Sequence, residues 1–413
     1  MRLNPFKALR PEPALASKVA AVPYDVVSRD EAARLAAGNP HSFLHVGRSD
    51  IDLPPDTDPH DDRVYAAARS ALDRFVAEGT LLREAEPSLY IYRQEMDGRV
   101  QTGVVGCVHI DDYERDVIRK HEKTRKDKED DRTRHVLTLD ANAEPVFLTY
   151  RGSDDVDRLV ERAVQGAPLY DFSAPDGVRH TVWRVADTRP LSEAFGMIPV
   201  AYVADGNHRS ASAWRAGREK RARNARHFGN EEYNWFLAVL FPAAQLAILP
   251  YNRVVKDLAG QTPAQVLERL RTLGRVSETR NPVPPRAGTF CIYLDHHWYL
   301  AELDPATVAS SDPIGSLDVS LLHDRILGPI LGIGDPRTDQ RVDFVGGIRG
   351  TAELERRVDS GEMALAVSMF PTTLDQLMRV ADAGEVMPPK STWFEPKLRS
   401  GLFVHTLDSP ESA

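Results

Sequence analysis

The stretch YVADGNHRSASAW, residues 202–214, organises the middle of the chain. Its first half is an apolar run typical of a buried strand, and its second half is rich in alanine and predicts a helix. Between the two, four polar side chains surround the glycine at position 206: Asp205, Asn207, His208 and Arg209. A helix cap needs only one short polar residue, so four different functional groups at this corner predict a binding or catalytic site.

The chemistry of this corner suits an anion. The first N–H groups of a helix have no partner inside it, and the helix dipole is positive there. We expect the backbone at Gly206, the side chains of Asn207 and His208, and the fork of Arg209 to hold phosphate. Asp205 is expected to bind Mg²⁺ or to accept a proton. The alternative is structural: Asp205 caps the helix, Arg209 pairs with a surface acid and His208 is a buried hydrogen-bonding residue.

A second group of functional side chains is HEKT, residues 121–124, which opens the charged block HEKTRKDKEDDRTRH. The block as a whole predicts a solvated helix held by i,i+4 ion pairs, and a plain surface helix is an equal alternative for its first residues. Arg125 stands where a zinc-binding HExxH motif needs histidine, which excludes that chemistry. The expected roles are phosphate or nucleotide binding by His121, Lys123 and Thr124, and base or metal-ligand chemistry by Glu122.

Three weaker patterns add candidates. Asp25 follows the rigid turn of PYD and is a candidate catalytic carboxylate, although a helix-entry cap explains it too. Arg253, in PYNRVV, would bring a cation for the nucleotide to the end of a buried strand. Lys390 and Ser391 lie in the proline-framed loop PPKSTWFEPK, which would clamp an anionic substrate or simply pack. Walker, Rossmann and α/β-hydrolase motifs are absent from the sequence.

Composition excludes several classes of protein. The net charge of −9 argues against general nucleic-acid binding. Cys107 and Cys291 are the only cysteines, which argues against a disulfide scaffold or a cysteine zinc site. No signal peptide and no membrane-spanning stretch is recognised, so we expect a soluble, cytoplasmic protein without a membrane partner.

Strand-like runs pair locally and helices lie between them, which predicts an α+β protein with mixed sheets. SLYIYRQE and VQTGVVGCVHI, joined through Asp97-Gly98, predict a hairpin, and SRDEAARLAAG predicts a short helix with Ser28 and Glu31 as its capping box. We expect three regions: residues 1–150 with PYD and HEKT, a core at 151–260 around ADGNHR, and a C-terminal α/β region at 261–413.

Seven segments together resemble a bacterial family, domain of unknown function family 1015: VPYDVVS, GNPHSFLHV, HEKTRKDKEDDRTRH, EPVFLTY, ADGNHRSASA, LPYNRVVKDL and MPPKSTWFEPKLRSGL. The likeness covers nearly the whole chain. ADGNHR also resembles the DGHHR signature of free-serine kinases in the ParB/sulfiredoxin-like superfamily, with Asn207 in place of the first histidine. Those enzymes use Mg²⁺ to transfer a phosphoryl group between ADP or ATP and free L-serine, giving O-phosphoserine.

The second resemblance implies a ParB/sulfiredoxin-like core around ADGNHR and a phosphotransferase with Mg²⁺ and ADP or ATP. It implies that Gly206, His208 and Arg209 bind phosphate, and that Asp205 binds metal or substrate. The kinases' catalytic glutamate has two candidates here, Asp25 and Glu122. We expect PYD, HEKT and ADGNHR, with the two end segments of the chain, to close over one site. Two alternative functions stay open: a phosphoserine phosphatase-type hydrolase and a nucleotide-dependent ParB-like binding module. A homodimer is possible as the oligomeric state.

Overall fold

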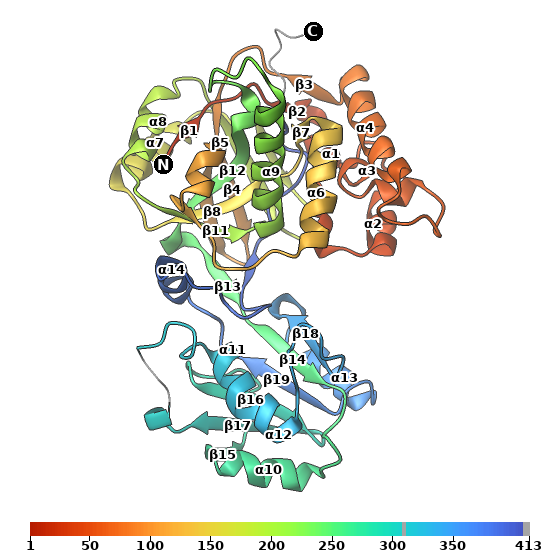
Figure 1. The fold of residues 1–413 in the computed structure, drawn as a ribbon, viewed down its shortest axis with the longest axis vertical. Helices are drawn as coiled ribbons and strands as arrows, with labels where there is room; N and C mark the ends of the chain where they lie inside the picture. Colours follow the sequence, from red (N-terminus) through yellow and green to blue (C-terminus); the bar gives the residue numbers. More distant parts are fainter. Residues whose placement is uncertain (308–310, 408–413) are drawn as a thin grey trace. The chain divides into compact units, whose positions relative to one another are not determined.

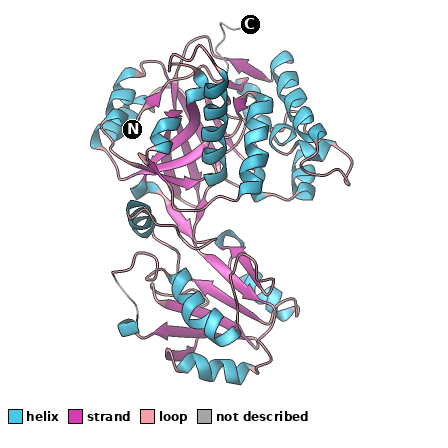
Figure 2. Cartoon of the chain, viewed as in Figure 1, coloured by secondary structure: helices cyan, strands magenta, loops and turns pink. Residues whose placement is uncertain are grey.

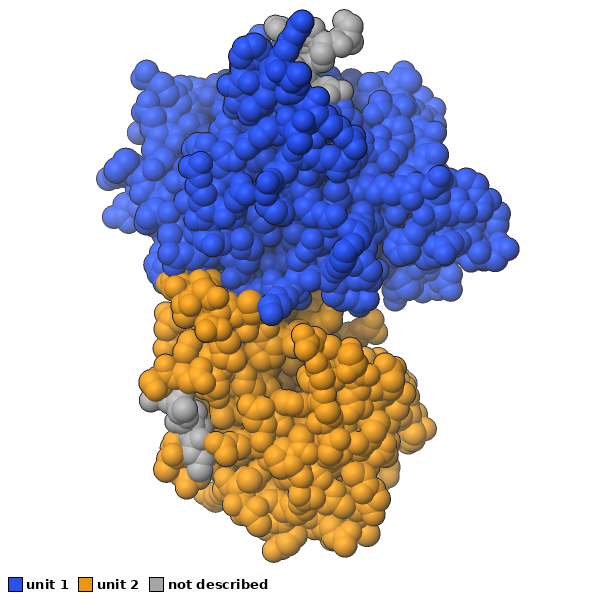
Figure 3. Space-filling view, viewed as in Figure 1, with its two compact units in different colours: residues 1–246, 396–413 blue, residues 247–395 orange. Residues whose placement is uncertain are grey.

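The computed structural model describes residues 1–307 and 311–407, and its contacts divide the chain into two compact units (Figures 1 and 3). Unit 1 comprises residues 1–246 and 396–413, and unit 2 comprises residues 247–395. This division differs from the three predicted regions, because regions 1–150 and 151–260 contribute strands to one sheet. Residues 308–310 and 408–413 of the third predicted region lie outside the described residues.

Unit 1 is built on a nine-stranded mixed sheet of order β6-β11-β8-β12-β5-β4-β10-β9, with β1 beside β5. The pairs β6–β11 and β8–β12 are parallel and the others are antiparallel. The mixed pairing, with helices between the strands (Figure 2), confirms the predicted α+β class. The strands are β1 (Leu3–Asn4), β4 (Leu89–Met96), β5 (Arg99–His109), β6 (Ile118–Arg119), β8 (Val146–Tyr150), β9 (Tyr170–Ser173), β10 (Arg179–Val185), β11 (Ala201–Asp205) and β12 (Trp235–Pro242).

The central strands of this sheet are apolar because both faces are covered. Every residue of β8 is buried, and β12 is buried from Phe236 to Pro242. Gly103 on β5 lets the ring of Phe241 approach, since a Cβ there would lie 2.8 Å from the ring. The predicted hairpin is confirmed: β4 and β5 pair through Asp97 and Gly98, which have φ of 50° and 76°.

Two long helices, α6 and α9, pack against each other on unit 1 (Figure 1). The capping box of Ser28 and Glu31 starts α2 as predicted. The predicted surface helix starts at Lys126, so HEKT precedes it. The helices of unit 1 are α1 (Ala16–Val19), α2 (Arg29–Ala36), α3 (Leu44–Gly47), α4 (Asp62–Ala77), α5 (Ile110–Glu114), α6 (Lys126–Leu139), α7 (Asp154–Ala163), α8 (Arg189–Gly196) and α9 (Asn207–Arg223).

Short elements complete unit 1. Strand β2 (Leu9–Pro11) pairs with β3 (Leu81–Arg83), and β7 (Ala141–Asn142) pairs with β21 (His405–Thr406) from the end of the chain. Single turns of 3₁₀ helix are η1 (Pro13–Leu15), η2 (Tyr24–Val26), η3 (Ser49–Asp52), η4 (Glu232–Asn234) and η5 (Ala243–Gln245).

Unit 2 contains a six-stranded sheet of order β15-β17-β16-β19-β14-β18 and a separate pair, β13–β20. Between α11 and α12 of this unit lies a turn of π-helix, η7 (Leu322–Leu327). The strands are β13 (Ala247–Leu249), β14 (Tyr251–Val255), β15 (Gly274–Glu278), β16 (Thr289–Leu294), β17 (His297–Leu303), β18 (Val342–Gly346), β19 (Leu365–Met369) and β20 (Trp393–Glu395). The helices are α10 (Pro263–Arg271), η6 (Pro305–Thr307), α11 (Asp318–Leu321), α12 (Gly328–Leu331), η8 (Gly347–Arg349), α13 (Ala352–Asp359) and α14 (Leu374–Asp382). Across the described residues, no helix has the length and apolar character to cross a membrane.

Candidate functional site

The predicted strand-to-helix corner is present in unit 1. Strand β11 ends at Asp205, helix α9 begins at Asn207, and Gly206 between them has φ of 88°. Within the described part of the chain, no side chain caps α9. A Cβ on Gly206 would lie 3.0 Å from Cζ of Arg209. Only glycine combines the left-handed backbone with a guanidinium group packed directly against it.

Arg209, the predicted phosphate fork, is buried. Its side chain is only 6% exposed, and it lies within a cluster of acceptors. One terminal nitrogen donates to the carbonyl oxygen of Pro145 at 2.6 Å, and the other donates to Oδ2 of Asp205 at 3.2 Å. The second nitrogen is also 3.6 Å from Oδ2 of Asp25. Arg209 therefore holds two carboxylates beside the start of α9, and we expect it to position groups rather than grip phosphate with its whole fork.

Asp205 stands between two cations. Besides Arg209, it accepts a hydrogen bond of 3.4 Å from Nζ of Lys397. Burial opposes ionisation of Asp205, but the charges of Lys397 and Arg209 outweigh it and lower the pKa to about 2. The carboxylate is therefore ionised at neutral pH and its charge is balanced by the protein.

The HEKT segment lies against the first turn of α9. The backbone N–H of Arg125 donates to Nε2 of His208 at 3.1 Å, and Nδ2 of Asn207 donates to Oε2 of Glu122 at 3.4 Å. Burial lowers the pKa of His208, so we expect a neutral ring with its proton on Nδ1. Asp25, Glu122, Asp205 and His208, the predicted catalytic residues, thus all lie around the start of one helix.

The other HEKT residues take different positions. His121 is 1% exposed, neither ring nitrogen has a hydrogen-bond partner among the described residues, and burial lowers its pKa to about 4. The hydroxyl group of Thr124 donates to Glu129 of α6, which commits it to the protein. Lys123 is exposed. Of the predicted phosphate ligands in HEKT, Lys123 therefore has the most freedom to reach a ligand.

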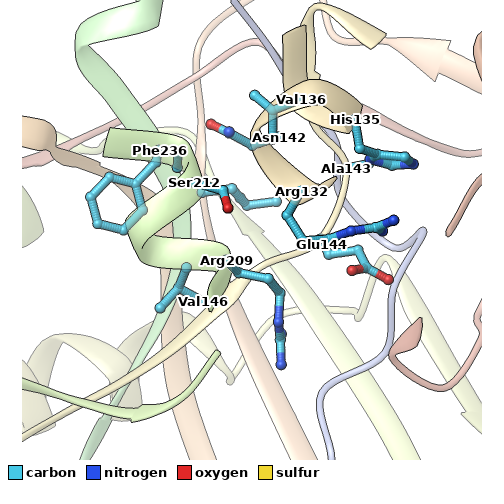
Figure 4. Close-up of a pocket in the computed structure, with 12 residues that line it drawn as sticks. Arg132, His135, Val136, Asn142, Ala143, Glu144, Val146, Arg209, Ser212 and Phe236 are labelled. Carbon is cyan, nitrogen blue, oxygen red and sulfur yellow. The ribbon is translucent and has the colours of Figure 1, made fainter. Parts of the chain in front are cut away.

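A small cavity of about 30 Å³ lies next to this corner, between α6, α9 and the sheet (Figure 4). Its charged lining residues are Arg132, Glu144 and Arg209. Oε1 of Glu144 accepts hydrogen bonds from Oγ of Ser400 at 2.9 Å and from the backbone N–H of Tyr24 at 3.4 Å. Burial raises the pKa of Glu144, against the opposing charge of Arg209.

Glu144, Lys397 and Ser400 were not among the predicted site residues. Each lies in a segment that carries the family resemblance, EPVFLTY or MPPKSTWFEPKLRSGL, so a signal for them was present in the sequence. That signal could not identify their contacts, because the pairs Lys397–Asp205 and Ser400–Glu144 are 192 and 256 residues apart in the chain.

The remaining candidates belong to unit 2. Arg253 on β14 is 4% exposed and donates to the carbonyl oxygen of Lys390 at 3.0 Å. Oγ of Ser391 donates to the carbonyl oxygen of Pro388 at 2.6 Å. Unit 2 therefore brings Arg253, Lys390 and Ser391 together, and their part in binding nucleotide or substrate stays a prediction.

The described residues do not fit the predicted metal site. Within residues 1–307 and 311–407, no three His, Cys, Asp or Glu side chains form a cluster that would hold an ion. Asp205, the predicted ligand, faces the cations Lys397 and Arg209, which would repel a metal ion.

A family model described as protein of unknown function (DUF1015) matches residues 3–320. No curated protein matches the sequence. The structure is similar to a free serine kinase in complex with AMP, with 12% identity and a TM-score of 0.37 over 74% of this chain and 92% of the kinase. It is also similar to a conserved hypothetical protein from Pyrococcus furiosus, with 13% identity and a TM-score of 0.36 over 73% and 95% of the two chains. C-terminally truncated SbnI from Staphylococcus aureus gives 12% identity and a TM-score of 0.39 over 73% and 87%.

Proposed function

The chain belongs to the DUF1015 family of proteins of unknown function, and we propose that this member is a phosphotransferase that moves a phosphoryl group between a nucleotide and the hydroxyl group of a small molecule. One observation carries this proposal: the uncapped start of α9 is surrounded by HEKT, Asp25, Asp205 and Lys397. An anion site with carboxylates beside it is what phosphoryl transfer to a hydroxyl group requires.

Phosphate binding is assigned to the first turn of α9. The backbone N–H groups after Gly206 and the Nδ1–H of His208 would donate to phosphate oxygens, and Lys123 would add charge from solvent. Arg209 and Lys397 hold Asp205 and Asp25 in place, so that the donors stay oriented when the ligand arrives.

Glu122 is the proposed general base. The amide of Asn207, the first residue of α9, donates to Oε2 of Glu122, which supports a position beside the bound phosphate. The carboxylate takes the proton of the substrate hydroxyl group, the hydroxyl oxygen forms a bond to phosphorus, and the bond from phosphorus to the leaving nucleotide oxygen breaks. The reverse reaction returns the proton to the hydroxyl oxygen. Asp25, the second candidate base, is paired with Arg209.

The finer assignment rests on the resemblance of ADGNHR to free-serine kinases. It supports free L-serine and O-phosphoserine as the substrate pair, ADP or ATP as the nucleotide, and a ParB/sulfiredoxin-like core around the motif.

Phosphorus NMR tests this proposal. The purified protein is incubated with O-phosphoserine, with and without AMP and ADP, in buffer containing Mg²⁺. Loss of phosphoserine with growth of a new nucleotide phosphate signal supports transfer and identifies the acceptor. Inorganic phosphate without nucleotide would make the protein a hydrolase. No change in any sample, together with no nucleotide binding in calorimetry, contradicts the proposal; nucleotide binding without turnover favours the binding module.

The variant Glu122→Gln tests the base. We expect transfer to fall by about 10²–10⁴-fold while nucleotide affinity stays within about 2-fold, because the amide keeps the shape but cannot take a proton. Glu161→Gln, an exposed substitution on α7, is the matched control and should change neither. Equal activity of Glu122→Gln and the wild type would contradict the assignment.

A further inference from the structure

We propose that Glu144 is a positioning residue that fastens two distant segments of unit 1, residues 21–25 and 397–400, to the start of α9. The inference rests on the proposed function, since those segments carry Asp25 and Lys397, but its structural part is testable without any reaction. Glu144 lines the small cavity together with Arg209, whose charge opposes the rise in the pKa of Glu144, and it acts on the site by positioning other groups.

The two segments first pair with each other. The backbone N–H of Ala21 donates to the carbonyl oxygen of Ser400 at 3.1 Å, and the N–H of Ser400 donates back to Ala21 at 2.8 Å. This bridge is isolated, since it lies outside the named strands. A single bridged pair is weak by itself, so side-chain contacts have to fix its position.

Glu144 supplies those contacts from one carboxylate oxygen. Its Oε1 accepts from Ser400 at 2.9 Å and from the N–H of Tyr24 at 3.4 Å, and thereby contacts both sides of the bridge. A Cβ on Gly47 would lie 3.0 Å from the same oxygen, so the backbone closes on the carboxylate from a third side. The carboxylate is therefore held in one place and can define the position of its partners.

The next residue links this arrangement to α9. The carbonyl oxygen of Pro145 accepts the 2.6 Å hydrogen bond from Arg209, whose other terminal nitrogen faces Asp25 and Asp205. The dipeptide 144–145 thus holds Arg209 through its backbone and the segment before Asp25 through its side chain. Lys397, three residues before Ser400, meets Asp205. Glu144 therefore contacts both segments, and its neighbour Pro145 contacts Arg209.

Hydrogen–deuterium exchange measured by mass spectrometry tests the fastening directly. In Glu144→Ala we expect faster exchange in peptides that cover residues 21–26 and 397–402, with the rest of unit 1 unchanged. Ser400→Ala removes one of the two donors and should give a smaller change in the same peptides. Glu161→Ala is the control. Unchanged exchange in both segments, or a uniform increase across unit 1, overturns the inference.

A double-mutant cycle tests the link to catalysis. Glu144→Gln should lower kcat by about 10-fold with KM for the nucleotide within about 2-fold, because moving the segment that carries Asp25 disturbs the geometry at the start of α9 more than it weakens binding. Adding Glu144→Gln to Asp25→Asn should cost less than about 2-fold more, since both changes affect one unit. Independent, multiplying losses would overturn this link. If the wild type transfers no phosphoryl group, the proposed function fails while the exchange experiment still decides the fastening.

Discussion

Helices α4 and α9 have nearly the same length, 16 and 17 residues, and belong to the same unit, yet they begin in opposite ways. The carboxylate of Asp61 caps α4 and accepts the backbone N–H of Arg63 at 2.9 Å. Helix α9 follows Gly206 without a side-chain cap among the described residues, and its first turn buries Asn207, Arg209 and Ser210. A helix that only has to fold satisfies its first donors itself. A helix whose first N–H groups have no cap, and whose start is surrounded by buried charges, is less stable by itself but can bind a ligand there.

The largest expected effect comes from Gly206→Ala. The new Cβ at φ 88° would press on the guanidinium group of Arg209, so we expect phosphoryl transfer to fall by about 100-fold or more and phosphate affinity to fall with it. The chain offers a matched control at the end of α4. Gly79→Ala, at φ 73° with no atom within 4 Å of the added Cβ, brings the same backbone strain without the contact.

Activity assays and thermal melts on both glycine variants separate strain from contact. Gly79→Ala should lower Tm slightly and leave transfer unchanged. An equal loss of activity in the two variants would show that the start of α9 is not special.

The next effect is on stability. Asp205→Asn removes the carboxylate that Arg209 and Lys397 share. The pKa of Asp205 falls from 3.8 to about 2 on folding. We therefore expect the free energy of unfolding, measured in urea at pH 7, to be about 2 kcal/mol lower in the variant. Because the folded pKa is lowered, this contribution is present above pH 4 and is lost as the pH falls towards 2. The difference between wild type and variant should therefore shrink in acid; a constant difference would rule out the charge pairing as its source.

A second effect on stability, seen only in acid, concerns the buried histidines around α9. Burial lowers the pKa of His121 to about 4 and that of His135 to about 3, from an ordinary value of 6.5. The unfolded chain binds protons below pH 6.5 that the folded chain cannot take, so stability should fall by about 1 kcal/mol per pH unit for each histidine between pH 6 and pH 4. Urea midpoints measured against pH, for wild type and His135→Gln, check this. An unchanged slope in the variant would contradict it.

The smallest effect is expected at the start of α4. Asp61→Ala removes the N-terminal cap of α4, which has no part in the proposed site at α9. Tm should therefore fall by only about 2 °C, and phosphoryl transfer should stay at the wild-type level. Transfer assays and melts on the same preparation measure both. A loss of activity here would remove the contrast between the two helices.

The sequence predicted what local patterns determine. Ser28 and Glu31 form the capping box, and Asp97 and Gly98 form the turn of the hairpin, because each depends on neighbours within a few positions. The corner at Gly206 was predicted for the same reason. The position of HEKT outside α6 could not be predicted from local sequence. It depends on a tertiary contact, because the N–H of Arg125 donates to His208, which lies 83 residues further along the chain.

The charge balance of the site could not be predicted in this way. The guanidinium group of Arg209 has the chemistry of a phosphate ligand. Its burial against Pro145 and Asp205, however, depends on how strand β8, which begins at Val146, packs with helix α9, which begins at Asn207. Glu144, Lys397 and Ser400 come from remote segments, and no periodic pattern relates positions so far apart.

The contact between Asp205 and Lys397 also sets the order in which the protein can be completed during synthesis. The two residues are 192 positions apart, and unit 2 lies between them in the chain. At 5–20 residues per second, a ribosome needs about 10–40 s to pass from one to the other. Throughout that time the nascent chain lacks Lys397 as a partner for Asp205 and Ser400 as a partner for Glu144. The start of α9 can therefore reach its final electrostatic state only after unit 2 has been synthesised, which makes its assembly one of the last events in the folding of unit 1.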